Sequence, residues 1–185
     1  MEQGTTEDRS LRKWYLVQTI VILAGTVFAW YTVVTDFLRF YHYEGTLFKV
    51  RDCVVPNPVV TPCFYGALAF ILALALSIQV LRKEENRTTI QRYLTWLLGA
   101  GTLFAAGNFT LTMVRYVQSN ATGESFIACS GIPAATPLTT PCFFGLIFYA
   151  AAFMVALSII RKRKLAADAT QLPTMPLPKK TSAQP

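Results

Sequence analysis

Four long stretches of this 185-residue chain are almost without charge. They cover Trp14–Phe37, Phe64–Leu81, Tyr93–Val114 and Phe143–Ile160, and Asp36 is the one charged residue within them. A helix needs about 20 apolar residues to cross a hydrocarbon core about 30 Å thick, and these stretches have that length. A long helix of a soluble protein would carry charge on its outer face. The pattern therefore predicts an all-α integral membrane protein with four transmembrane helices.

The chain also repeats itself. Thr61–Gly66 (TPCFYG) returns as Thr140–Gly145 (TPCFFG), and Ala24–Thr26 (AGT) returns as Ala100–Thr102. Each unit contains two spans, so both copies insert in the same direction. The sequence thus predicts two tandem parallel-repeat helical hairpins with pseudo-two-fold symmetry. We expect the first and third spans to meet near the symmetry axis, because their small residues allow close backbone approach.

The repeat divides the chain into five parts, each with its own composition. A cytoplasmic N-terminal segment (1–13) is followed by a first repeat of two spans and an exofacial cysteine loop (14–83). A cytoplasmic connection (84–92) leads to a second repeat of the same kind (93–164). The remainder (165–185) is rich in proline and has no apolar period, which predicts a disordered cytoplasmic tail.

Lysine and arginine are distributed unevenly between the two sides of these spans. Of the 17 basic residues, 13 lie on the side that holds both termini and the central connection. The other side has Arg39, Lys49, Arg51 and Arg115. The positive-inside rule therefore places both termini in the cytoplasm and the cysteine loops outside a plasma or bacterial inner membrane. The expected partners are the lipid bilayer and either another membrane protein or a second copy of the chain. No nucleic acid is expected, because the basic residues flank spans.

All four cysteines, Cys53, Cys63, Cys129 and Cys142, fall in the exofacial loops or at their edges. An oxidising compartment favours disulfides, and four cysteines allow three connectivities. The duplication favours Cys53–Cys63 with Cys129–Cys142. The Thr-Pro-Cys triplets also predict helix starts, with threonine as N-cap and proline at the first helical position. In that position a cysteine thiolate is stabilised by the helix N-terminus, as in redox-active sites.

Two interpretations of the cysteines follow. In the first, the disulfides fasten the loops to the helix ends. In the second, they are redox-active. Four spans with exofacial cysteine pairs resemble, in topology only, the DsbB and vitamin K epoxide reductase type of membrane thiol oxidase. That resemblance implies a quinone as electron acceptor. The chain has no C-x-x-C motif, so the resemblance assigns no catalytic residue.

Polar residues recur at matched positions near the outer ends of the first and third spans. The spacing places each set on one helix face. The residues are Thr32, Asp36 and Arg39 in the first span, and Asn108, Thr112 and Arg115 in the third. They are interpreted either as interfacial anchors or as a polar vestibule in which the arginines hold an anionic group.

The sequence contains no serine–histidine–aspartate set, no phosphate loop and no metal cluster. His42 is the sole histidine and has no metal ligand at a suitable spacing. The predicted function is therefore a non-enzymatic membrane subunit with two disulfide-closed exofacial loops, for assembly, interaction or binding of a small ligand, and without a cofactor. The alternative is a membrane thiol–disulfide oxidoreductase that uses a quinone.

Overall fold

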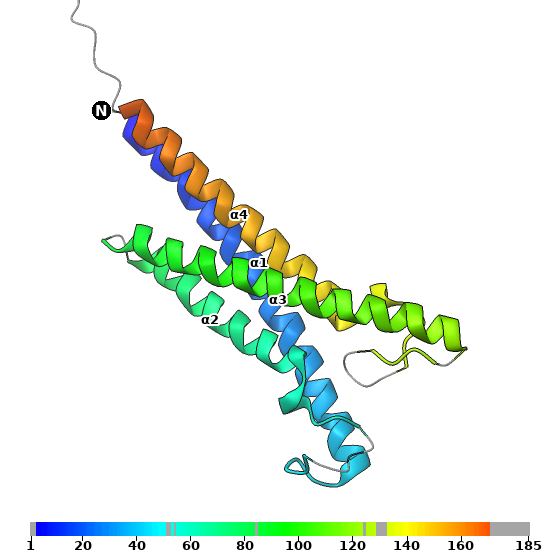
Figure 1. Ribbon diagram of the computed structural model, residues 1–185. Helices are drawn as coiled ribbons and strands as arrows, with labels where there is room; N and C mark the ends of the chain where they lie inside the picture. The colour runs from blue at the N-terminus through cyan, green and yellow to red at the C-terminus, as the bar shows by residue number, and fades with distance from the viewer. Residues whose placement is uncertain are drawn as a thin grey trace, which may run out of the picture.

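The computed structural model describes residues 3–50, 53, 55–83, 85–123, 125–128 and 133–170. Four helices make up most of these residues (Figure 1): α1 (Gln3–Glu44), α2 (Pro62–Arg82), α3 (Arg87–Thr122) and α4 (Pro141–Thr170). Short 3-10 turns, η1 (Pro58–Val60) and η2 (Pro137–Thr139), precede α2 and α4. All four helices are long and apolar enough to cross a membrane. The prediction of an all-helical chain with four helices long and apolar enough to span a membrane is confirmed for the described residues.

The helices differ in how far they extend beyond a bilayer core. At 1.5 Å per residue, the 21 residues of α2 cover about 31 Å, which is one membrane crossing. The 36 residues of α3 cover about 54 Å, so α3 continues well past the apolar stretch. Helix α4 also runs to Thr170, beyond the position where the disordered tail was predicted to begin. Leu165, Ala166 and Ala167 are strong helix formers, which explains the extension.

The four helices form a bundle in which sequential neighbours pack in hairpins and the hairpins pack on each other. Helix α1 contacts α2 and α4, and α3 contacts the same two helices. Figure 1 shows the first half of α1 beside the last half of α4, at the end where the α2–α3 connection also lies. We call this the basic end and the opposite one the loop end. Each 3-10 turn packs on its own hairpin, η1 on α1 and α2, η2 on α3 and α4.

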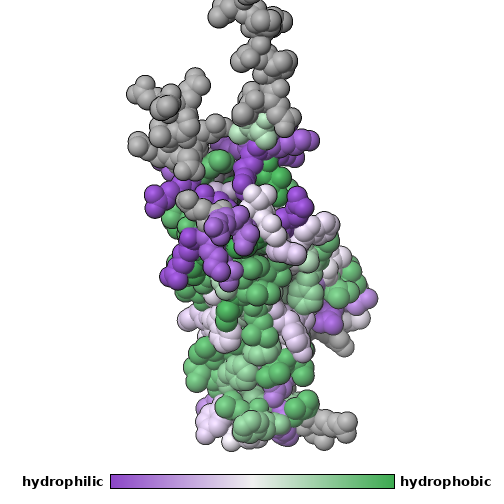
Figure 2. Space-filling view, turned by 90° about the vertical axis from the view of Figure 1, so that its left-hand side faces the viewer, coloured by the Kyte–Doolittle hydropathy of each residue, from purple (hydrophilic) through white to green (hydrophobic). Residues whose placement is uncertain are grey.

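The surface of the bundle is apolar around its middle. Figure 2 shows a wide hydrophobic band, with hydrophilic residues gathered above it at the basic end. Large apolar side chains on this band are exposed, among them Leu103 (76%), Trp96 (73%) and Met154 (62%). Such a belt is compatible with lipid as the surrounding solvent and supports the assignment to a membrane.

All four helices contribute to the buried centre of the bundle, where aromatic rings from α2 and α4 meet. The rings of Phe70 and Tyr149 stack there with centroids 3.9 Å apart. A Cβ built on Gly25 of α1 would lie 2.6 Å from the ring of Phe70, and one on Gly101 of α3 would overlap the ring of Tyr149. The small residues of α1 and α3 therefore accept aromatic rings rather than each other's backbone.

The prediction that the first and third spans meet at the axis is consequently wrong. Among the described residues the backbones of α1 and α3 make no close approach, because they lie on a diagonal of the bundle. A side-chain hydrogen bond links α1 and α3 in the half toward the basic end. There Gln91 Nε2 donates to Gln18 Oε1 over 3.0 Å, and both residues are buried.

Candidate functional site

The two repeated Thr-Pro-Cys triplets begin α2 and α4, as predicted. Pro62 and Pro141 are the first helical residues, so Cys63 and Cys142 each stand second in a helix. Thr61 is at the N-cap position of α2, but its hydroxyl makes no capping bond and instead donates to the carbonyl of Pro58 over 2.7 Å. Thr140 likewise donates to Pro137 over 2.6 Å. The predicted helix starts and the N-cap position of Thr61 are thus confirmed, while the Thr61 hydroxyl closes the 3-10 turn instead of capping the helix.

The starts of α2 and α4 converge, and their cysteines meet. Cys63 Sγ lies 4.0 Å from Cys142 Sγ. This separation is about twice the 2.05 Å of a disulfide bond, so the sulfurs are in contact but not bonded to each other. Cys142 is buried and Cys63 is half-buried. We call Cys63 and Cys142 the inner cysteine pair.

The structure describes both cysteines of one predicted disulfide and one cysteine of the other. Within the described residues, no disulfide joins Cys53 to Cys63. Cys53 Sγ lies 3.6 Å from the carbonyl oxygen of Lys49, at the distance of a weak hydrogen bond. Cys129 lies outside the described residues, so the pairing Cys129–Cys142 is not tested. The predicted Cys53–Cys63 bond is therefore not present in this structure, and the Cys129–Cys142 bond stays a prediction.

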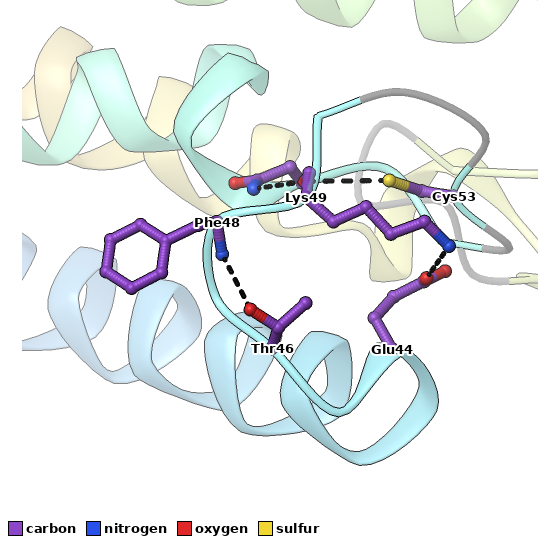
Figure 3. Close-up of polar contacts among 6 residues, drawn as sticks. Glu44, Thr46, Phe48, Lys49 and Cys53 are labelled. Carbon is purple, nitrogen blue, oxygen red and sulfur yellow. Dashed lines mark hydrogen bonds and ion pairs between the residues drawn. The ribbon is translucent and has the colours of Figure 1, made fainter.

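Hydrogen bonds hold the described part of the loop between α1 and α2, near Cys53. The side-chain amide of Asn57 donates to the carbonyls of Lys49 (2.8 Å) and Leu47 (3.3 Å), and its oxygen accepts the backbone N–H of Val59. Figure 3 shows the ammonium of Lys49 against Glu44, at 2.6 Å, with the sulfur of Cys53 near the Lys49 backbone. The described residues of this loop are therefore held together by hydrogen bonds and an ion pair.

A small apolar cavity adjoins the inner cysteine pair. Its volume is about 60 Å³, room for a few water molecules and well below the roughly 300–1,000 Å³ of organic ligand sites. A quinone ring therefore does not fit this cavity as it stands. All four helices contribute to the wall, which includes Phe28, Thr32, Cys63, Phe70, Phe104, Asn108, Cys142 and Tyr149.

The structure separates the predicted polar vestibule into two parts. Thr32, Asp36 and Arg39 line a neighbouring cavity of about 240 Å³ beside the start of α4. Arg39 Nη1 there forms an ion pair with Asp36 Oδ1 at 3.1 Å, so its charge is already balanced.

The third-span residues lie elsewhere. Asn108 lines the small cavity beside the inner cysteine pair, together with Thr32. Thr112 is buried and donates to the carbonyl of Asn108, while Arg115 is exposed and lines neither cavity. The arginines are therefore not brought to one cavity, and an anion site stays a prediction.

Two functional features escaped the sequence analysis. The stacked rings of Phe70 and Tyr149 form the floor beneath the inner cysteine pair, and the Tyr149 hydroxyl donates to the Gly66 carbonyl over 2.8 Å. The sequence did contain a signal for this pair of rings. The alignment of the two repeats that pairs Cys63 with Cys142 also pairs Phe70 with Tyr149. His42 packs against Tyr43, and no cluster of metal ligands occurs within the described segments.

Comparison of the chain with protein-family models, with curated proteins and with solved structures gives no match.

Proposed function

We propose that this protein is a membrane thiol–disulfide exchange protein in which the inner cysteine pair transfers a disulfide between the two hairpins. One observation carries the proposal: Cys63 Sγ and Cys142 Sγ lie 4.0 Å apart. Near-attack geometry requires reacting atoms about 3–3.5 Å apart, so an approach of roughly 0.5–1 Å would suffice. Two disulfides that serve only to fasten separate loops have no need to place their sulfurs in contact.

The exchange needs no partner beyond the four cysteines. With Cys129–Cys142 oxidised, the Cys63 thiolate attacks Cys142 Sγ; the Cys63–Cys142 bond forms, and Cys129 leaves as a thiolate that takes up the proton lost by Cys63. Cys53 then attacks Cys63, which releases Cys142 as a thiol. The pair Cys53/Cys63 has lost two electrons and two protons, and the pair Cys129/Cys142 has gained them.

Two further features support this chemistry. Cys63 and Cys142 each stand second in a helix, so the starts of α2 and α4 hold the two sulfurs at equivalent positions next to each other. The bonds of Asn57 hold the first loop in place, so a disulfide at Cys53 is free to open without loss of the loop. A quinone has no part in the proposal, because the cavity beside the sulfurs is too small for its ring.

The proposal includes the arrangement of the chain in the membrane. The two hairpins are related by a pseudo-two-fold axis along the membrane normal, with both termini in the cytoplasm and the cysteine loops outside. The pairs Gly25–Phe70 and Gly101–Tyr149 support this relation, because the same kind of glycine-to-ring contact occurs in each half at equivalent positions of the repeat.

The experiment is a cross-linking test in lipid nanodiscs. A variant with Cys53→Ser and Cys129→Ser retains the inner cysteine pair and should form an intramolecular disulfide under mild oxidation, detected by mass spectrometry of unreduced peptides. The matched control, with Cys63→Ser and Cys142→Ser, retains the outer cysteines and should not form one at a comparable rate. In the unaltered protein, both pairs should equilibrate with glutathione redox buffers.

The opposite result would support the non-enzymatic subunit of the sequence analysis. The exchange mechanism would be overturned if Cys63 and Cys142 failed to cross-link and if the Cys53–Cys63 and Cys129–Cys142 disulfides both had reduction potentials below about −300 mV.

A further inference from the structure

A groove on the outer surface of the bundle, remote from the cysteines, lies between α3 and α4. Its volume is about 540 Å³, within the range of organic ligand sites. Trp96 and Leu103 of α3 and Phe153 of α4 line it, and Arg92 lies at its basic end. Gly99 forms part of the floor: a Cβ there would lie 3.2 Å from the ring of Phe153.

The first half of the chain has a different surface at the corresponding positions. The alignment that pairs Ala24–Thr26 with Ala100–Thr102 also pairs Leu16 with Arg92 and Leu23 with Gly99. The second half therefore has a side chain removed from the floor and a positive charge added at one end. Lipid-facing surfaces of membrane helices avoid charge. The difference between the halves indicates a ligand that has both an apolar and an anionic part.

A second arginine lies beyond the basic end of the groove, outside its lining. Arg163 of α4 donates through Nη2 to Thr88 Oγ1 over 2.6 Å, whereas its Nη1 is buried with no hydrogen-bond acceptor. Thr88 stands one helical turn before Arg92, so both lie on the same face of α3. The hydrogen bond to Thr88 thus holds the Arg163 guanidinium beside the face of α3 that carries Arg92. An anion near this end would interact with both positive charges and offset their repulsion.

We propose that this groove binds an anionic phospholipid, with the phosphate between Arg92 and Arg163 and one acyl chain along the floor at Gly99. The planar guanidinium fork suits phosphate oxygens. The exposed apolar walls suit an acyl chain, since Trp96 is 73% and Leu103 is 76% exposed. The charge at one end and the hydrocarbon walls beyond it match the two parts of the lipid.

The test uses the fluorescence of Trp96 in a Trp14→Phe, Trp30→Phe background. Phosphatidylglycerol brominated on its acyl chains should quench Trp96 at lower mole fraction than brominated phosphatidylcholine. Each arginine should account for roughly a fivefold preference. Arg92→Gln with Arg163→Gln should abolish the preference, whereas the control Lys83→Gln, at an exposed residue of the same end, should retain it. Ala100→Leu, which fills the groove, should weaken quenching by both lipids.

Native mass spectrometry of the protein with its own tryptophans gives a second measurement, independent of whether the background variant folds. It should find phosphatidylglycerol retained on the unaltered protein and on Lys83→Gln but lost from the double arginine variant. Equal quenching and equal retention of the two lipids, or a preference that survives both arginine substitutions, would overturn the proposal.

Discussion

Replacing Gly101 by alanine should destabilise this protein, although alanine is the better helix former. The added Cβ would overlap the ring of Tyr149, which is stacked on Phe70 and cannot retreat into that ring. Overpacking of this kind costs about 1–3 kcal/mol. Relief of the glycine's conformational entropy returns about 1 kcal/mol. The expected change is a net loss of about 1 kcal/mol in the free energy of unfolding.

Gly107 of the same helix provides the matched control. A Cβ there meets nothing within 4 Å, so Gly107→Ala should leave the protein as stable or raise its stability by up to about 1 kcal/mol. The difference between the two variants isolates the overpacking penalty, about 1–3 kcal/mol. Reversible unfolding in mixed micelles, followed by circular dichroism, measures both.

A double-mutant cycle then assigns the penalty to the ring. In a Tyr149→Ala background the obstructing atoms are gone, so Gly101→Ala should cost nothing there. The reasoning would be refuted by a Gly101→Ala protein as stable as Gly107→Ala, or by a penalty that persists without the tyrosine ring.

Three shorter predictions follow from the same structure. Gln18→Leu alone should lower the free energy of unfolding by about 1 kcal/mol, because it leaves Gln91 without its hydrogen-bond partner. The double variant, Gln18→Leu with Gln91→Leu, should be closer in stability to the unaltered protein, and two losses that simply add would contradict this. Tyr149→Phe should lower the free energy of unfolding by about 0.6 kcal/mol through loss of the bond to the Gly66 carbonyl, and no change in the melting curve would count against that bond. A reporter fused after Pro185 should be active in the cytoplasm alone, and activity outside would reverse the proposed orientation.

Much of the fold follows from the sequence because its signals are local. Apolar length determined the four spans, since each stretch must satisfy its own backbone in a bilayer. Proline after threonine determined where α2 and α4 begin, because Pro62 and Pro141 have no backbone N–H to leave unsatisfied at a first helical position. Composition was a poorer guide to helix ends, as the extension of α4 to Thr170 illustrates.

The sequence did not predict how the four helices pack against one another. Gly25 and Gly101 signalled a close approach but not its partner, and the structure brings rings from α2 and α4 to them instead of backbone from each other. Which helices contact each other at the centre of the bundle depends on how the two rings and the two glycines pack together in one volume. No single segment of sequence contains that information.

For the candidate site, too, part of the arrangement follows from the sequence and part from the tertiary structure. The sequence by itself determined that Cys63 and Cys142 stand at equivalent helix starts, because the triplet that begins each helix is repeated. That their sulfurs lie 4.0 Å apart was decided by the tertiary structure alone. Sequence separation fixes a distance only along one helix, whereas this contact depends on the convergence of α2 and α4 above the stacked rings of Phe70 and Tyr149.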